Sequence, residues 1–381
     1  MTTFQNLNRC VACGGFNLSL VIDLEDQPLA NDFSRCPRYT SIEKYPLALN
    51  RCDSCGHLQL TVSVDRSSIF NNYIYRSGTS NTLKQYSDWF AKKITDRHGV
   101  GRILDIACND GTQLDSFNKL GWETYGVDPA QNISEYNKHE HRVAFFDEKC
   151  LDLGRFDVII AQNVLAHTDD PQKILEVAGM MSDNIYIQTS QAKMIDRGEF
   201  DTIYHEHISF FSPSSMAALA NASGLGLKDF EIVPIHGDSF LFYISSGFNN
   251  TETYTWSKEE TDLFAEKAKR IVLDLGKVMV ETDLPIIGYG AAAKAMTVIN
   301  AMGIGPDYIV DDAVDKQFKF CPGSNIPVLP VDVLSDAPDH IMFIPFAWNF
   351  AEEIINRTRL VYKGKMDIVK YFPEVSMWQQ S

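Results

Sequence analysis

Short apolar runs and longer segments with helical spacing alternate along the central part of the chain. The apolar runs at 102–107, 122–127 and 156–161 each end in turn residues, and helix starts fall near Thr112 and Pro171. Strands that alternate with helices form a mostly parallel sheet covered on both faces. The pattern therefore predicts a doubly wound α/β domain.

Beyond this domain two further strands are predicted at 228–234 and 239–245, joined by His236-Gly237-Asp238. A short polar connection containing glycine is typical of a hairpin. We expect this hairpin to close the parallel sheet with an antiparallel edge, as in class I methyltransferases.

The C-terminal third repeats the α/β pattern. Apolar residues recur at helical spacing from Ser257 to about Glu281, and Ser257 with Glu260 forms a predicted capping box. Later come a strand with a glycine turn around Gly290 and a second strand ending in Asp311. We predict a second Rossmann-like sheet. The expected domains are 1–72, 73–250 and 251–381.

Composition narrows the class of protein. The chain has 381 residues, 45% of them hydrophobic, and a formal net charge of −16. This charge repels nucleic acid, so no nucleic-acid partner is expected. No apolar run is long enough for a membrane span, and residues 1–5 lack a signal-peptide pattern. We expect a cytoplasmic protein without a membrane partner.

Four of the eight cysteines form two pairs near the N-terminus. Cys10 and Cys13, then Cys52 and Cys55, are C-x-x-C knuckles followed by glycine, with 38 residues between them. Four thiolates fill a tetrahedral shell and leave no open position. The predicted module therefore holds a structural Zn²⁺ ion, and Cys36 is expected to be a bystander.

The turn after the first predicted strand contains candidate cofactor residues. Gly111 allows a close backbone approach, and the acid Asp128 at the tip of the second strand is placed to bind ribose hydroxyls. The turn lacks the G-x-G-x-x-G of a dinucleotide site, which favours S-adenosylmethionine as the cofactor. The remaining candidates are Asp105, Asn109, Asp110 and Asn163. Asp105 as a buried core acid and Asn163 as a loop-bonding residue are the alternatives.

The segment Tyr204-His205-Glu206-His207 concentrates a phenol, a carboxylate and two imidazoles. Imidazole titrates near neutrality, so a histidine here is a candidate general base. If the segment were a strand, His205 and His207 would share a face and could instead bind a metal. For His205 a structural role is preferred.

The glycine turn of the second sheet offers a different kind of site. Gly290 and Lys294, with the start of the following helix, are predicted to hold a diphosphate. Two alternatives stay open: the glycines serve only packing, or the sheet binds NAD in an oxidoreductase of sugar nucleotides.

Four stretches together resemble one family: the twin knuckles, 109–112, 204–207, and Gly288-Tyr289-Gly290-Ala291 with Lys294. They are similar to S-adenosylmethionine-dependent sugar C-methyltransferases, three-domain enzymes that methylate C3 of nucleotide-linked 4-keto-deoxysugars. The resemblance runs along the whole chain, and Ala347-Trp348-Asn349-Phe350 also looks like a family segment. It implies that the domains follow one another along the chain in the order zinc module, methyltransferase domain and C-terminal Rossmann-like domain.

The resemblance also implies roles for individual residues. His207 corresponds to the catalytic base, while Tyr204, Glu206 and a tyrosine after the zinc module, preferably Tyr75 over Tyr73, line the same pocket. This chain departs from the family at Arg76-Ser77-Gly78 and at 237–240, which puts the exact sugar in doubt. His236 and Asp238 are therefore expected to contact substrate.

The implied reaction removes the C3 proton next to the 4-keto group and methylates the resulting enolate. The expected substrate carries dTDP, with GDP or CDP as alternatives. O- or N-methylation of another small molecule and a dehydrogenase are the competing activities; a non-catalytic binding protein is the remaining alternative.

Overall fold

The chain divides into two compact units, each with its own α/β sheet. The computed structural model describes residues 4–40, 42–65, 77–79 and 81–379. Unit 1 comprises Met1–Ser19, Asn50–Ala192 and Glu206–Trp256; unit 2 comprises Leu20–Leu49, Lys193–His205 and Ser257–Ser381.

Unit 1 is built on a seven-stranded sheet of order β12-β13-β10-β9-β6-β7-β8. The five strands from β10 to β8 are parallel, whereas β13 runs antiparallel to both β10 and β12. The doubly wound sheet with an antiparallel hairpin edge is therefore confirmed. The strands are β6 (Arg102–Ile106), β7 (Glu123–Asp128), β8 (Glu140–Val143), β9 (Val158–Gln162), β10 (Ile185–Thr189), β12 (Leu225–Val233) and β13 (Ser239–Ser246).

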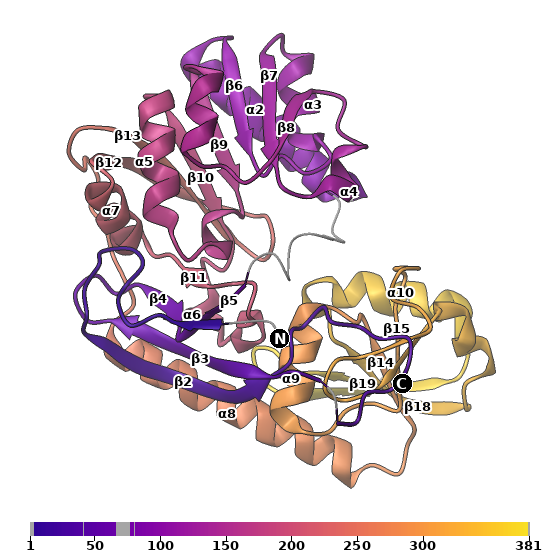
Figure 1. Cartoon of the computed structure of the whole chain (residues 1–381). Helices are drawn as coiled ribbons and strands as arrows, with labels where there is room; N and C mark the ends of the chain where they lie inside the picture. Colours follow the sequence, from indigo (N-terminus) through magenta and orange to yellow (C-terminus); the bar gives the residue numbers. More distant parts are fainter. Residues whose placement is uncertain (1–3, 41, 66–76, 80, 380–381) are drawn as a thin grey trace. The chain divides into compact units, whose positions relative to one another are not determined.

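Helices cover both faces of this sheet (Figure 1). Successive side chains of a strand point to opposite faces, so Ile103, Val158 and Ile160 lie on one side. They join a buried core with Phe90 of α2 and Phe117 of α3. The helices and short 3-10 turns of unit 1 are α2 (Asn81–His98), α3 (Thr112–Lys119), α4 (Gln131–Ser134), α5 (Pro171–Met181), α7 (Pro213–Ala222), η1 (Ser77–Thr79), η2 (Glu148–Leu153) and η3 (Leu165–His167).

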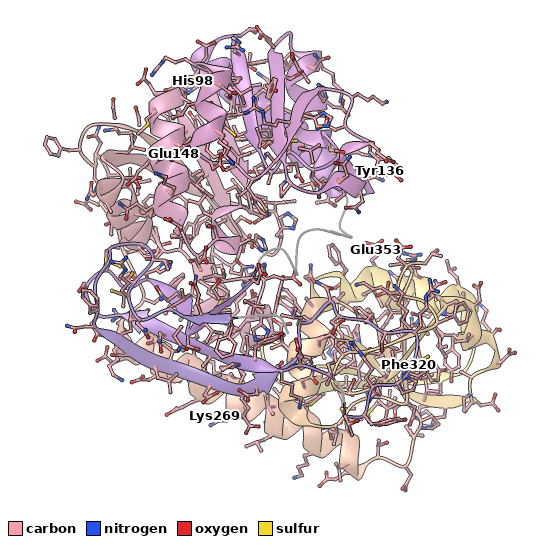
Figure 2. All side chains as sticks on the ribbon, in the orientation of Figure 1. His98, Tyr136, Glu148, Lys269, Phe320 and Glu353 are labelled. Atoms are coloured by element: carbon pink, nitrogen blue, oxygen red, sulfur yellow. The ribbon has the colours of Figure 1, made fainter. Side chains whose placement is uncertain are left out.

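The amino end of the unit 1 sheet is closed by packed rings. Tyr186 of β10 stacks on its cross-strand partner Tyr243, with ring centroids 4.8 Å apart. Its hydroxyl bonds to Nε2 of His98, a residue labelled in Figure 2, at 2.8 Å. In open α/β sheets ligands bind at the carboxyl ends of the strands, so the opposite end of this sheet is the candidate site.

Small strands make up the N-terminal part of unit 1. β1 (Phe4–Asn6) pairs antiparallel with β5 (Val62–Val64), and β11 (Ser209–Phe210) pairs with β4 (Leu58–Leu60). The chain passes into unit 2 within β2 (Leu18–Gln27) and returns within β3 (Tyr45–Cys52).

Unit 2 has a second seven-stranded sheet, of order β16-β17-β15-β14-β18-β19-β20. The inner strands from β17 to β19 are parallel, while β16 and β20 form antiparallel edges. This confirms the predicted Rossmann-like arrangement. The strands are β14 (Ile286–Tyr289), β15 (Tyr308–Val310), β16 (Lys319–Phe320), β17 (Pro327–Leu329), β18 (His340–Pro345), β19 (Lys365–Lys370) and β20 (Ser376–Gln379).

The longest helix of unit 2 begins at the predicted capping box. Ser257 accepts a hydrogen bond from the N–H of Glu260, and the Glu260 carboxylate accepts one from the N–H of Ser257. The helices and 3-10 turns of unit 2 are α6 (Met194–Arg197), α8 (Lys258–Glu281), α9 (Ala293–Met302), α10 (Ala351–Val361), η4 (Phe200–Thr202), η5 (Val331–Asp336) and η6 (Trp348–Phe350). Within the described ranges, no helix is apolar over a length that would cross a bilayer.

Candidate functional site

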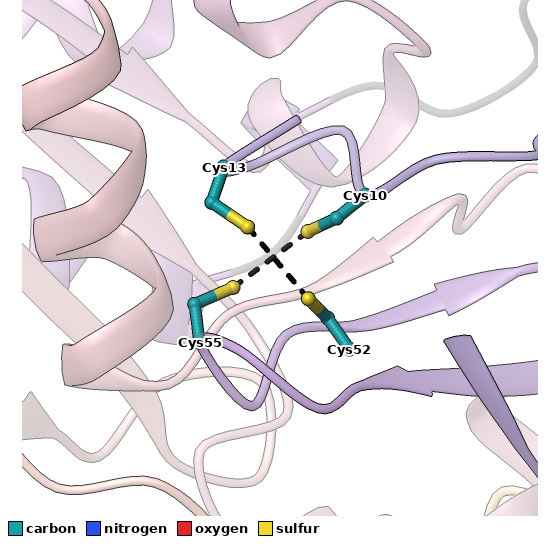
Figure 3. A group of neighbouring side chains, drawn as sticks. All are labelled: Cys10, Cys13, Cys52 and Cys55. Atoms are coloured by element: carbon teal, nitrogen blue, oxygen red, sulfur yellow. Dashed lines mark hydrogen bonds between the residues drawn. The ribbon is translucent and has the colours of Figure 1, made fainter. Parts of the chain in front are cut away.

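The four N-terminal cysteines converge on one point (Figure 3). All four Sγ atoms lie within 4.8 Å of one another, with Cys10 and Cys55 at 3.6 Å and Cys13 and Cys52 also at 3.6 Å. A tetrahedron with Zn–S bonds of about 2.3 Å has sulfur–sulfur separations of about 3.8 Å. The donors therefore fit Zn²⁺, and a complete thiolate shell makes its role structural.

Both knuckles have the same backbone geometry. Gly14 and Gly56 adopt positive φ angles of 75° and 71°, and each donates its N–H to the first cysteine of its knuckle at 2.8 Å. Glycine takes this left-handed conformation at no steric cost. At Gly56 a Cβ would also lie 2.1 Å from Oγ1 of Thr255, so this position excludes a side chain twice over.

The predicted cofactor turn lies between β6 and α3, at the carboxyl end of the unit 1 sheet. Asp128, at the tip of β7, accepts hydrogen bonds from the N–H of Asn109 at 2.9 Å and of Ala130 at 2.8 Å. Burial raises the pKa of Asp128, and these two bonds oppose the rise. A carboxylate has about four acceptor positions, so these two bonds do not use all of them.

The other polar side chains of the turn hold neighbouring backbone. Asn109 accepts a bond from the N–H of Ser77 at 3.1 Å, and Asp110 accepts one from the N–H of Gly78 at 2.9 Å. Asp110 also accepts from the hydroxyl of Thr112 at 2.7 Å, which fixes the first turn of α3. These two residues therefore shape the turn through bonds to backbone on both sides.

Gly111 is the N-cap of α3 and has a φ of 81°. A Cβ at this position would lie 2.6 Å from Oδ1 of Asn137.

Asp105 lies inside β6 and is buried. Burial, and to a smaller extent the charge of Asp128, raises the pKa of the Asp105 carboxyl. A buried acid of this kind favours its neutral form.

Two loops meet at the carboxyl ends of β9 and β10. Asn163 has a positive φ of 54°, and its Oδ1 accepts a bond from the N–H of Ser190 at 3.1 Å. His167 lies further along the first loop, where its Nδ1 donates to the carbonyl of Glu206 at 2.7 Å. Burial lowers the pKa of His167 to about 4, so this ring is neutral near pH 7.

His207 lies beside these loops within unit 1. Its ring centroid is 4.9 Å from that of His167, and its Nδ1 is 3.3 Å from Nε2 of Gln191. The resemblance to sugar C-methyltransferases singled out His207, and neither it nor the sequence pattern identified Gln191. A polar residue in the loop after a buried strand was the signal available for Gln191.

The rest of the acid–base segment is a bend and turn, not a strand. The metal alternative at His205 and His207 depended on a strand, and the structure has none at these residues. Nε2 of His205 donates to the carbonyl of Tyr45 at 3.2 Å, and burial lowers its pKa to about 4. Tyr204 is partly buried and Glu206 is buried, while Tyr73 and Tyr75 lie outside the described residues.

The hairpin loop between β12 and β13 reaches the same edge of unit 1. His236, Gly237 and Asp238 all have positive φ, at 55°, 81° and 76°. The carbonyl of Asp238 accepts the N–H of Ala192, the residue after Gln191, at 3.1 Å. The hairpin loop is thus fastened next to the histidine pair.

Side chains from the segment that follows β15 hold the glycine turn of unit 2 in place. Asp311, at the end of β15, accepts the N–H of Ala291 at 2.7 Å, and Nζ of Lys316 donates to the carbonyl of Ala291 at 2.7 Å. Gly290 has a φ of 94° and donates its N–H to Val310. The following helix α9 begins after Ala292 without a side-chain cap.

Lys294, in the first turn of α9, is close to aromatic and acidic groups. Its Nζ lies 4.6 Å from the ring centroid of Trp348, and it lowers the pKa of both Glu199 and Asp201 against a larger rise from burial. The indole N–H of Trp348 donates to Asp201 at 2.7 Å. A phosphate at Lys294 would therefore compete with two carboxylates for its charge.

Three family models match the chain in consecutive segments. “Putative zinc binding domain” matches residues 10–70, “Methyltransferase domain” matches residues 79–228, and “C-methyltransferase C-terminal domain” matches residues 245–373. The first contains the cysteine cluster, and the second contains the turn between β6 and α3 with Asp128.

The chain is also similar to individual proteins. C-methyltransferase NovU from Streptomyces niveus is 24% identical over 93% of this chain and 92% of its own length. A ubiquinone biosynthesis O-methyltransferase from Nitrobacter winogradskyi is 28% identical over 34% of this chain and 58% of its own. A magnesium protoporphyrin IX methyltransferase structure from Synechocystis covers 43% of this chain and 79% of its own at 11% identity, with a TM-score of only 0.34.

Three features define an S-adenosylmethionine-dependent methyltransferase: the doubly wound sheet, the predicted cofactor turn between β6 and α3, and the segment that matches the methyltransferase domain. With the putative zinc binding segment before it and the C-methyltransferase segment after it, the chain is an S-adenosylmethionine-dependent C-methyltransferase, similar to C-methyltransferase NovU over 93% of its length.

Proposed function

We propose that this C-methyltransferase acts on C3 of a nucleotide-linked 4-keto-deoxysugar, in the biosynthesis of a branched deoxysugar. The observation that carries the proposal is the imidazole of His207 beside His167 at the carboxyl end of the methyltransferase sheet. The four motif stretches that resemble sugar C-methyltransferases support the choice of substrate.

The chemistry requires a base and a way to hold the enolate. His207 takes the C3 proton, the C–H electron pair forms the enolate double bond, and the carbonyl oxygen becomes negative. A phenol, that of Tyr204 or Tyr75, donates a hydrogen bond to this oxygen. C3 then bonds the methyl carbon while the C–S electron pair stays on sulfur, giving S-adenosylhomocysteine.

S-adenosylmethionine supplies an electrophilic methyl group when it is bound. Asp128 would hold its ribose hydroxyls, and Gly111 would let the turn approach it closely. Asn109, Asp110 and Asn163 keep the neighbouring loops in place, while Asp105 is buried beneath the turn.

The nucleotide part of the substrate, dTDP first and GDP or CDP as alternatives, is assigned to unit 2. The uncapped start of α9 after Gly290 supports a diphosphate there, with Lys294 beside it. His236 and Asp238 are assigned to the sugar, supported by the bond that fastens their loop next to Gln191. None of the eight cysteines forms a disulfide, which suits a reducing cytoplasm.

The test is a panel of 4-keto sugar nucleotides incubated with S-adenosylmethionine, with products located by mass spectrometry and carbon NMR. We expect a new methyl group on C3 with at least one sugar nucleotide, and none with His207→Asn. His340→Asn, a histidine of unit 2 at the amino end of β18, is the matched control and should stay active. A methyl group on oxygen or nitrogen, or no product from any sugar, would contradict the proposal.

A further inference from the structure

The carboxyl end of β10 carries buried polar atoms without hydrogen-bond partners. Among the described residues, Nε2 of Gln188, Oγ1 of Thr189 and Oε1 of Gln191 are buried and unpaired. Buried polar side chains are normally paired, because an unpaired one loses its bonds to water. Three such atoms within four positions lower the stability of the folded chain, which indicates that the residues at this strand end have a functional role.

Gln191 has two further unusual features. Its φ of 71° is left-handed, a conformation that costs free energy for a residue other than glycine. Its amide nitrogen lies 3.3 Å from Nδ1 of His207, and both side chains are buried. Backbone strain, an unpaired oxygen and an imidazole contact therefore coincide at one residue.

The orientation of a glutamine amide is an assignment, since its oxygen and nitrogen have nearly the same shape. With Nε2 toward His207, Nδ1 must accept, so the neutral ring carries its proton on Nε2. With the amide reversed, Oε1 accepts a bond from Nδ1–H, and Nε2 of the ring is the basic nitrogen. Only the reversed amide also suits the protonated ring, in which both nitrogens are donors.

A base must become protonated during the reaction, so the reversed orientation fits its task. We propose that Gln191 is a positioning residue for His207: its Oε1 accepts the Nδ1–H bond, fixes the tautomer and stabilises the imidazolium. This inference rests on the proposed role of His207 as the base.

The groups around His207 fit this arrangement. His167 faces it from η3; burial lowers the pKa of His167 to about 4, so that ring is neutral near pH 7 and adds no repelling charge. Phe210 of β11 contributes a ring edge at 6.2 Å. The segment also carries Tyr204 and His205, and Glu206 is the adjacent residue; a negative charge on Glu206 would favour the imidazolium.

The first test uses three variants and the pH dependence of kcat/KM. Gln191→Met keeps the side-chain length and removes the acceptor, so kcat/KM should fall about 10- to 100-fold, as for a lost bond to a charged group. The acidic limb of its profile should move to lower pH. Gln191→Glu should move that limb to higher pH, and Gln172→Met on α5 is the control with an unchanged profile. Circular dichroism and calorimetric binding of S-adenosylmethionine check that each variant is folded.

The second test observes the wild-type ring directly. Histidine ¹⁵N chemical shifts at pH 8, assigned with His207→Asn, should show the Nδ1–H tautomer in the wild type and a mixture of tautomers in Gln191→Met. An Nε2–H tautomer in the wild type, or a Gln191→Met profile that matches the wild type, would overturn the inference. If these results overturn the inference and His207→Asn is inactive, only the role of Gln191 is rejected and His207 remains the proposed base. If His207→Asn stays active, the proposed function itself is rejected.

Discussion

The two α/β units share one local design and use it differently. Each has a strand, a turn with a glycine, a helix and a second strand that ends in an acid. In unit 1 the acid Asp128 bonds the N–H of Asn109, and in unit 2 Asp311 bonds the N–H of Ala291 in the same way. The equivalent acid thus supports the turn in both sheets.

The difference lies in what surrounds each turn. Unit 1 places non-glycine residues in the left-handed region after three neighbouring strands, at Ala107, Asn109, Asn163 and Gln191. In the unit 2 turn only Gly290 has a positive φ among the described residues 290–294, and Lys316 also bonds the turn carbonyl. Strained backbone clusters at functional sites, which agrees with the catalytic role proposed for His207 in unit 1. The same topology therefore does not imply the same ligand.

The largest expected difference between the units concerns zinc, because all four ligands belong to unit 1. Structural zinc contributes directly to folding. Cys55→Ser or strong chelation should unfold the module that contains β1 and β5, and hydrogen exchange should rise there far more than in unit 2. Cys36→Ser removes an exposed thiol outside the cluster and is the control. Equal exchange in both units after chelation would show that zinc does not hold unit 1 in particular.

The second prediction compares the two acids. Asp128→Asn should weaken S-adenosylmethionine binding about 10- to 100-fold, because charge-assisted acceptors are lost. Asp311→Asn should leave this affinity unchanged and lower the free energy of unfolding by about 1 kcal/mol. Isothermal calorimetry and denaturant unfolding measure the two effects. A similar loss of affinity in Asp311→Asn would mean that unit 2 also binds the donor.

The smallest expected effect is a pH dependence of stability from buried neutral histidines. The pKa of His167 in unit 1 and of His205 in unit 2 is lowered to about 4, below the unfolded value of about 6.5. Between these values the unfolded chain binds more protons, so stability falls as pH drops from 6.5 to 4. His205→Phe should reduce the slope by at most about 1.4 kcal/mol per pH unit. A slope in His205→Phe equal to that of the wild type would show that His205 takes no part in it.

Local patterns made most of the fold predictable from the sequence. Some features are set by residues close together in the sequence: the strand that leads to Gly111, the second strand ending in Asp128, and the Ser257–Glu260 capping box. The structure has each of these features where the sequence pattern placed it. Long-range packing was not predictable. Residues 20–49 and 193–205 belong to the C-terminal unit, although they lie far from it in sequence.

The candidate site was predictable to the same extent. The pattern pointed to a histidine in the segment and the family resemblance assigned the base role to His207, but the contact with Gln191 depends on the chain folding back over sixteen positions. The bonds from Asn109 and Asp110 to the backbone of Ser77 and Gly78 join segments thirty-two positions apart. The spacing of residues along the chain does not predict such pairs. Only the folded structure shows which of them are in contact.

Deuterium exchange at C3 of a 4-keto sugar nucleotide that the enzyme accepts as a substrate tests the central claim most directly. With S-adenosylhomocysteine bound in place of the donor, no methyl group can be transferred, so exchange reports proton removal alone. The wild type should incorporate deuterium from D2O at C3, and His207→Asn should not. No exchange in the wild type, or equal exchange in His207→Asn, would contradict His207 as the base that prepares the carbon for methylation.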